Sequence, residues 1–458
     1  MPQVLTPPIV PAAFLGQASS AEPAWPSPDW WLKFGSPELA DFIARAHTAN
    51  LNLAVAAARV MEARAQTTIQ RAALFPQLNL QAQAESAAPG SVDSTSGLSS
   101  PRTNTFGLSL GASYEVDIWG LARSNLRAAA EALKSARFAQ QAVALTITAN
   151  VADVYFSVLA LRKRIALANE DIAAIDGILA IIKLKVSTGS SSHLDLAQEQ
   201  AQLESVQARL PVLEEQELEA RVALAVLLGQ PPQTLEVRTP TDEAIHPPVV
   251  TPGLPSDLLI RRPDVAQAEA NLASAHANLD AARAAFLPQF ALNGSGGYAS
   301  AAVDTLLHGP SLAWDYGGNL LQTVFDGGKL LGQKELARAT QEELIASYQL
   351  AVLNAYADVE TALGQVKNNS EEEGHLEREV DAAREAFQIS QLQYRQGTTE
   401  LLTVLQSQQT LFSAEDQLAQ ITLARMQAVV HLYEALGGGW MEPSEERTQF
   451  SRLARTPR

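Results

Sequence analysis

Strict alternation of apolar and polar residues predicts four strands. The clearest case is 106–118, where every second residue is apolar. The apolar face of this stretch includes Phe106, Leu108, Leu110 and Tyr114. The opposite face includes Ser109, Ser113 and Glu115. The other strands are predicted at 78–85, with Asn79, Gln81 and Gln83 on the polar face, at about 289–298, and at 312–320, with Trp314 and Tyr316 on the apolar face.

Long helical patterns separate these strands. One runs without proline from about 120 to 188, which corresponds to about 100 Å at 1.5 Å per residue. A return helix follows at about 194–228, and the second half of the chain repeats the arrangement, with a break at Gly397. Apolar residues recur every seven positions along both return helices, which predicts helices that coil around partners. Shorter helices are expected at 36–74 and 256–288.

The chain contains an internal duplication. Arg71-Ala-Ala-Leu-Phe-Pro-Gln77 returns as Arg283-Ala-Ala-Phe-Leu-Pro-Gln289, and Leu228-Gly229 returns as Leu436-Gly437. We therefore expect two structural repeats, at 36–229 and 255–437. A proline-rich connector at 230–254 joins them. An extended arm at 1–35 precedes them, and a tail at 438–458 follows.

The length of the strands bears on their environment. A strand needs about 9 to 11 residues to cross a bilayer at a tilt, and four strands are too few to close a barrel. Two, three or four copies would supply 8, 12 or 16 strands, with polar faces toward a lumen and apolar faces toward lipid. A soluble sandwich would show the same alternation, but it would not require helices this long.

Composition narrows the class of protein. The formal net charge is −17, which argues against a nucleic-acid partner and suits an aqueous path that disfavours anions. The chain contains no cysteine and no run of 18 apolar residues. It opens Met-Pro-Gln without a basic region and an apolar run, so a cytosolic protein and a mature form without its leader both remain open.

No motif predicts catalysis, a cofactor or a metal. Gly107-Leu-Ser-Leu-Gly111 matches the hydrolase elbow pattern, yet it lies in the middle of a predicted strand, and the elbow requires a strand-to-helix turn. The seven histidines are scattered without zinc spacing, and the four methionines form no cluster.

Several motifs carry a family resemblance. Ala112-Ser-Tyr-Glu-Val-Asp-Ile-Trp-Gly120 resembles the strand-to-helix junction of the outer-membrane efflux proteins of TolC type. The similarity is greatest to the OprM-like components of RND multidrug pumps. Four further motifs agree: Leu258-Leu-Ile-Arg-Arg-Pro-Asp-Val265, Ala281-Ala-Arg-Ala-Ala-Phe-Leu-Pro288, Tyr394-Arg-Gln-Gly397 and Tyr433-Glu-Ala-Leu-Gly-Gly-Gly-Trp440. The resemblance covers about 30–440.

The resemblance implies a homotrimer with a 12-stranded outer-membrane barrel on a helical periplasmic tunnel. It implies a passive duct that exports small amphipathic compounds. A periplasmic adaptor would dock at the two hairpin tips, Thr188-Gly189-Ser190 and Gln396-Gly397-Thr398, and would connect the duct to a proton-driven inner-membrane pump. A protein-secretion duct and a soluble coiled-coil scaffold are the alternatives.

The resemblance also implies a gate and two departures from the family. A leucine and, one turn later, an aspartate commonly form the constriction, and Leu402 and Gln406 occupy these positions here. Glutamine removes a ring of negative charge, so we expect weaker cation preference. Members of this branch usually begin with a lipid-modified cysteine, which this chain does not contain.

Overall fold

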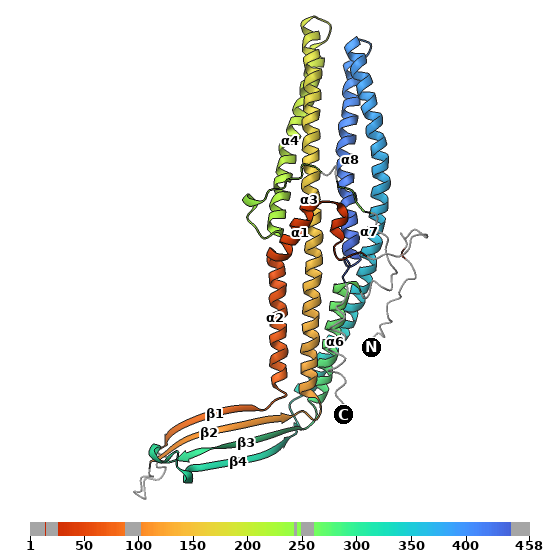
Figure 1. The fold of residues 1–458 in the computed structure, drawn as a ribbon. Coiled ribbons are helices and arrows are strands. Elements are labelled where there is room, and N and C mark those ends of the chain that lie inside the picture. Colours follow the sequence, from red (N-terminus) through yellow and green to blue (C-terminus); the bar gives the residue numbers. More distant parts are fainter. Residues whose placement is uncertain (1–13, 15–25, 88–101, 242–244, 249–260, 441–458) are drawn as a thin grey trace. The chain divides into compact units, whose positions relative to one another are not determined.

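The computed structural model of the chain describes residues 14, 26–87, 102–241, 245–248 and 261–440 (Figure 1). The predicted helix start at Ser256 lies outside these residues, as do most of the predicted arm and tail and part of the connector. The fold is mostly helical with one four-stranded sheet, so the predicted fold class is confirmed. Among the described residues, no helix has both the length and the apolarity that a membrane span requires.

The chain forms two compact units, and each combines segments from both predicted repeats. The hairpin unit comprises Met1–Ala58, Arg137–Gln267 and Gln349–Arg458. The strand unit comprises Arg59–Ala136 and Ala268–Tyr348. Duplicated sequence segments therefore pack with their counterparts and do not fold as two independent halves.

The sheet of the strand unit is antiparallel with the order β1-β2-β3-β4. Its strands are β1 (Gln77–Ala87), β2 (Thr103–Val116), β3 (Gln289–Ser300) and β4 (Leu312–Leu321). All four strands predicted from alternation are present. Strands β1 and β4 form the two edges, and neither pairs with a further strand in the described part of the chain.

Helices α2 (Leu51–Ala72) and α6 (Pro263–Ala284) contact the same stretch of α3 (Leu121–Ser187) within the strand unit. The Thr67 hydroxyl of α2 donates to the Ala129 carbonyl over 3.2 Å. The Ser274 hydroxyl of α6 donates to the neighbouring Ala128 carbonyl over 2.9 Å. Equivalent helices of the two repeats thus pack against consecutive carbonyls.

Two long helical hairpins build the other unit. Helix α3 turns into α4 (His193–Leu227), and α7 (Lys329–Gln396) turns into α8 (Leu401–Ala435). Ser192 begins α4 with a capping box, because its hydroxyl accepts from the Asp195 amide while Asp195 accepts from the Ser192 amide. Short 3-10 helices complete the described structure at Trp30–Phe34, Pro232–Thr234, Val303–Thr305 and Gly309–Ser311.

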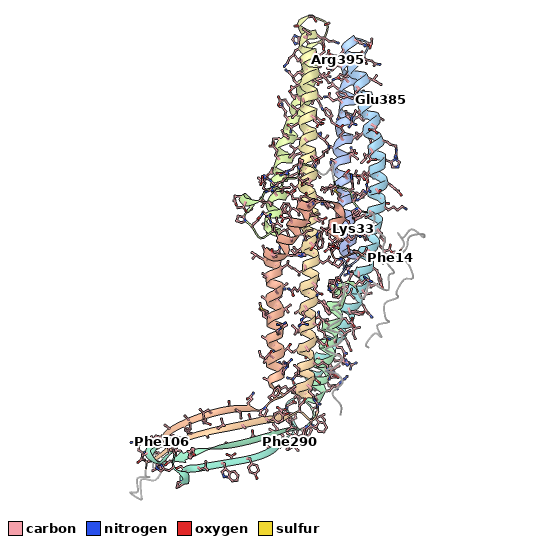
Figure 2. All side chains as sticks on the ribbon, in the orientation of Figure 1. Phe14, Lys33, Phe106, Phe290, Glu385 and Arg395 are labelled. Carbon is pink, nitrogen blue, oxygen red and sulfur yellow. The ribbon has the colours of Figure 1, made fainter. Side chains whose placement is uncertain are left out.

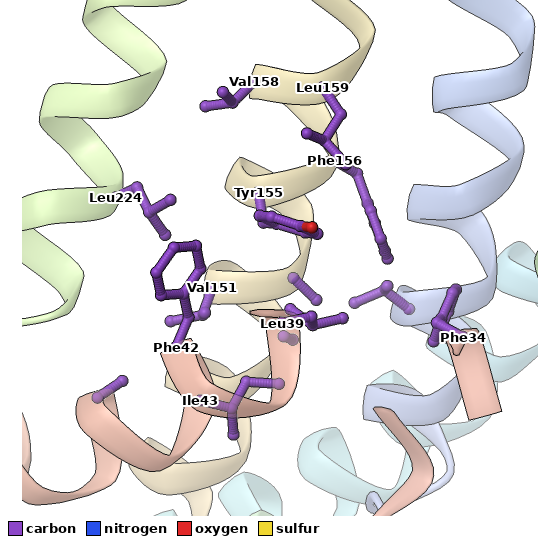
Figure 3. Close-up of a cluster of buried hydrophobic side chains, with 14 of the residues drawn as sticks. Phe34, Leu39, Phe42, Ile43, Val151, Tyr155, Phe156, Val158, Leu159 and Leu224 are labelled. Atoms are coloured by element: carbon purple, nitrogen blue, oxygen red, sulfur yellow. The ribbon is translucent and has the colours of Figure 1, made fainter. Parts of the chain in front are cut away.

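An apolar core in the hairpin unit holds α1 (Pro37–Ala49) against α3 (Figure 3). Leu39 and Phe42 of α1 are buried together with Tyr155 and Phe156 of α3, and Leu224 of α4 joins them. The Tyr155 hydroxyl lies 3.0 Å from the Ser36 hydroxyl, which also caps α1. This core anchors the segment that precedes the first strand.

The single helix predicted over 36–74 is wrong, because Asn50 divides it into α1 and α2. Asn50 has extended backbone geometry, and its side-chain oxygen accepts from the amides of Asn52 and Leu53. Its side-chain amide donates to the Leu227 carbonyl over 2.8 Å. Asparagine favours this role because it competes with helical hydrogen bonds and caps a new helix.

Candidate functional site

The strand register gives the sheet one apolar face. Directly paired residues project from the same side of an antiparallel sheet. Leu80 pairs with Leu110, Leu110 with Gly296, and Gly296 with Trp314. The six predicted lipid-facing residues all lie on this face: Phe106, Leu108, Leu110, Tyr114, Trp314 and Tyr316. Figure 2 labels Phe106 and Phe290 near opposite ends of the sheet.

Nothing in the described chain covers this apolar face at its edge strands. Leu80 of β1 is 74% exposed, and Trp314 and Tyr316 of β4 are 70% and 81% exposed. The Trp314 and Tyr316 rings stack with centroids 5.8 Å apart. Large apolar side chains that remain this exposed indicate contact with a nonaqueous surface.

The opposite face is polar across all four strands. The predicted lumen-facing residues meet there, because Gln81 pairs with Ser109 and Asn79 with Gly111. The remaining ones, Gln83, Ser113 and Glu115, share the face. Gln83 donates to Glu85 over 2.9 Å, Asn293 donates to Asn319 over 3.1 Å, and Ser295 donates to Asp315. Polar side chains that bond to each other on an exposed sheet suit contact with water.

Both strand-to-helix junctions use an aspartate to begin the long helix. Asp117 accepts from the amides of Ala122 and Arg123, and Asp326 accepts from the amides of Gly328 and Leu330. Burial alone would raise the pKa of Asp117, but its hydrogen bonds to Arg123 and Ala122 lower that pKa below the usual value. This role was not predicted from the sequence, although an acidic residue before a helix start is a recognisable signal.

The predicted hairpin tips are exposed turns. At the first tip, Gly189 has a φ of 74°, and the Ser190 amide donates to the Lys185 carbonyl over 2.8 Å. At the second tip, Gly397 has a φ of 77°, and the Thr398 amide donates to the Gln393 carbonyl over 3.0 Å. All six predicted tip residues are exposed: Thr188, Gly189, Ser190, Gln396, Gly397 and Thr398. Glycine fits here because the left-handed region penalises other residues.

A lysine joins the two hairpins near their tips, which the sequence analysis did not identify. The Lys185 ammonium of α3 donates to the Tyr394 carbonyl of α7 over 2.5 Å. The same ammonium lies 4.0 Å from the centroid of the Tyr394 ring. No periodicity or motif signals a contact of this kind between helices distant in sequence.

The predicted gate residues lie on the exposed side of α8. Leu402 is 52% exposed, and Gln406, one turn later, is also exposed. Leu401 and Val404 point the other way, into an apolar cluster of the hairpins. The structure therefore places Leu402 and Gln406 on one exposed face of α8, which begins directly after the second tip.

A cavity of about 720 Å³ lies between α3, α4 and α8, with Asp171 in its lining. Burial raises the pKa of Asp171 to about 7, and the charges of Glu415 and Glu170 add to the effect. Within the described ranges, no three metal-ligating side chains gather into a cluster.

Comparisons with known proteins agree with this architecture. The family profile described as outer membrane efflux protein matches residues 42–230 and 254–438. The chain is 39% identical to the pyoverdine export outer membrane protein OpmQ of Pseudomonas putida, over 95% of this chain and 93% of that protein. It is 30% identical to the toluene efflux pump outer membrane protein TtgI of the same species, over 93% and 91%.

Solved structures agree as well. The outer-membrane channel OprN superimposes with a TM-score of 0.89 at 26% identity, over 96% of this chain and 99% of that one. The open-state MtrE channel of Neisseria gonorrhoeae superimposes with a TM-score of 0.84 at 28% identity, over 96% and 98%.

Proposed function

This chain belongs to the outer membrane efflux protein family, and from that premise we propose that it works as a homotrimeric duct. It is an outer-membrane efflux channel, and its family comprises channels and not enzymes. Three copies of a four-stranded sheet give twelve strands, enough to close a barrel and leave no free edge in lipid. The observation that carries the proposal is the open sheet, whose β1 and β4 edges require partners.

In this proposal the two faces of the sheet have different surroundings. The apolar face with Leu110, Trp314 and Tyr316 contacts outer-membrane lipid. The polar face with Gln81, Ser109 and Glu115 lines the water-filled lumen. The uninterrupted register of both faces across four strands supports the assignment.

The hairpin tips are proposed to contact a periplasmic adaptor, and through it a proton-driven inner-membrane pump. Both tips are exposed and end the longest helices of the chain, which supports a docking role. Leu402 and Gln406 are proposed to form the constriction beside the second tip. Their exposure on α8 supports this, since equivalent residues of sister copies must be free to meet.

We also propose that the chain is divided into an N-terminal arm, two structural repeats, a connector between them and a C-terminal tail.

The proposed cargo is a small amphipathic compound. Two relatives named for pyoverdine export, at 39% and 38% identity, favour a small-molecule cargo over a secreted protein. Family membership argues against the soluble coiled-coil scaffold.

Two measurements test this function. We expect protein solubilised in detergent to have the mass of a trimer by light scattering with detergent correction. We expect it to conduct ions in a planar lipid bilayer. A stable monomer that dissolves in plain buffer and carries no current would overturn the proposal.

A further inference from the structure

A carboxyl group without a partner lies inside the apolar cluster of the hairpins. Glu199 of α4 is 0% exposed, and neither of its carboxyl oxygens has a hydrogen-bond partner in the described chain. A buried carboxylate without a partner is costly, whereas the neutral acid is far less so. The site therefore favours a bound proton.

Glu199 occupies a position that the helix pattern reserves for apolar residues. Leu196, Leu203 and Val206 precede and follow it at coiled-coil spacing, and all three belong to or pack against the cluster. From α3, Ile178 and Ile182 belong to the same cluster. The surroundings thus supply apolar contacts and no compensating charge.

A second polar side chain repeats this situation on α8. Gln408 is 0% exposed, and neither its side-chain oxygen nor its nitrogen has a partner. It lies between Val404 and Leu411, which belong to the same cluster. Glu199 in the first hairpin and Gln408 in the second are thus both buried polar side chains without a partner in the packing seam, a few turns from the tip.

Charged groups on the neighbouring turns do not offset the burial of Glu199. Those of α3, α4 and α7 that are exposed to solvent are Asp176, Lys183, His193, Glu204, Asp381, Glu385 and Arg395. Figure 2 labels Glu385 and Arg395. The others are engaged elsewhere: Lys185 with the Tyr394 carbonyl, Asp195 with Ser192, and Arg384 with Glu415. Helix α8 has no charged residue between Leu401 and Ala414. Burial accordingly raises the pKa of Glu199 from its ordinary 4.5 to about 7.

We propose that Glu199 is a proton-binding site in the α3–α4 seam, and that loss of its proton loosens the hairpin tips. The inference rests on the proposed function, because loosened tips widen the entrance of the duct. The packing described above, in which Glu199 is fully buried and which we term the closed arrangement, binds the proton more tightly than an arrangement in which water reaches Glu199. Low pH therefore favours the closed arrangement, and its advantage falls as pH rises from the ordinary pKa through the raised one.

The magnitude of this effect is bounded by linkage. One proton per chain changes the open-to-closed ratio by at most about tenfold per pH unit between the two pKa values. Basal conductance should therefore increase from pH 5 to about pH 7 and level off toward pH 8. Glu199→Gln keeps the shape of the side chain but has no proton to lose, so its conductance should stay near the pH 5 level of the unaltered chain.

The experiment measures basal conductance in planar bilayers at pH 5, 6, 7 and 8. Glu204→Gln is the matched control, because Glu204 is an exposed glutamate on the same helix. It should retain the full pH dependence. An equal pH dependence in Glu199→Gln and in the unaltered chain would overturn the proposal.

A second readout separates this proposal from the channel function. The chain contains no cysteine, so Ser190→Cys and Thr398→Cys allow spin labels at the two tips alone. The distance distribution should broaden as pH rises and should remain unchanged when Glu199→Gln is added. If no variant conducts, the proposed function falls, and the label distances still decide whether Glu199 controls the tips. Distances that do not respond to pH would overturn the proton site.

Discussion

Arg164 of α3 and Asp416 of α8 form a two-point ion pair that links the hairpins of the two repeats. The Arg164 Nε donates to Oδ1 over 2.6 Å, and Nη2 donates to Oδ2 over 3.2 Å. The paired geometry suits arginine because its planar guanidinium matches a carboxylate. The pair lies beside the cavity between α3, α4 and α8, where both residues contribute to the lining.

Breaking this pair should destabilise the hairpin unit. The side chains of Arg164 and Asp416 are 22% and 36% exposed, so we expect a coupling free energy of about 1 kcal/mol. A double-mutant cycle of Arg164→Met and Asp416→Asn, followed by thermal unfolding in detergent, measures it. The Arg338–Glu342 pair is the control, since both partners are 52% exposed and should couple by less than about 0.5 kcal/mol. Equal coupling in both pairs would contradict this expectation.

Replacing Gly229 by alanine should destabilise the protein by at least about 2 kcal/mol. Gly229 has a φ of 65°, and an added Cβ would collide with the Ala49 carbonyl. Gly177→Ala is the control, because Gly177 lies within α3 with open space around it. That change should stabilise the helix by about 0.5–1 kcal/mol. Chemical unfolding measures the change in unfolding free energy for both variants. A cost for Gly229→Ala no larger than that of ordinary surface substitutions would contradict the close approach of Gly229 to the Ala49 carbonyl.

Neighbouring positions on β1 should respond differently to arginine. Leu80→Arg places a charge on the proposed lipid face. It should lower the folding free energy of the membrane-inserted protein by up to about 2–4 kcal/mol. Gln81→Arg places the same charge on the proposed lumen face. It should insert normally and shift ion selectivity toward anions. The yield of bilayer-inserted protein and the reversal potential test both, and equal tolerance would argue against two distinct faces.

Shortening Leu402 to alanine should raise basal conductance. The leucine side chains of sister copies would otherwise close the constriction by apolar contact. Leu392→Ala is a suitable control, because Leu392 is 56% exposed on α7 but has no proposed role in the gate. Single-channel recording distinguishes the two, and an unchanged current for Leu402→Ala would place the constriction elsewhere.

Introducing aspartate at Gln406 should increase cation selectivity. The change adds one negative charge per copy at the proposed constriction, which attracts cations and repels anions. Gln406→Ala controls for the loss of the amide without a charge, and it should leave selectivity unaltered. Reversal potentials in a salt gradient measure the effect, and identical values for both variants would count against a constriction at this position.

Sequence patterns predicted the elements of the fold well because each has a clear period. Alternation located β2, where residues 106–116 project to two opposite faces, and the absence of proline located α3. Boundaries that depend on one side chain were less visible. Asn50 lies at the end of α1, and its side chain donates a hydrogen bond to the carbonyl of Leu227, a residue far away in the sequence. The periodicity of the neighbouring residues does not predict such a bond.

The repeated Leu-Gly motif shows both the value and the limit of a sequence repeat. Gly229 and Gly437 were predicted to end the two repeats, and both have a positive φ. An added Cβ would meet the Ala49 carbonyl in one case and the Arg261 carbonyl in the other. The sequence predicts the two positions, but only the structure shows which backbone carbonyl lies too close to each glycine to allow a side chain.

The buried polar groups and the links between hairpins lay beyond sequence reasoning. Glu199 falls at an apolar position of the coiled-coil spacing, but the sequence does not show that its carboxyl group is left without a partner. Lys185 and Tyr394 likewise meet through packing alone. Their chemistry comes from desolvation and proximity, which arise after folding.

The unpaired edge strands of the sheet have a consequence for how the channel assembles in the membrane. Along β1 and β4, backbone amides and carbonyls face outward with nothing to bond within the described chain. Hydrocarbon offers them no substitute for water. In the proposed trimer a single copy would have no low-energy way into the bilayer, so we expect assembly of the three copies and membrane insertion to be coupled.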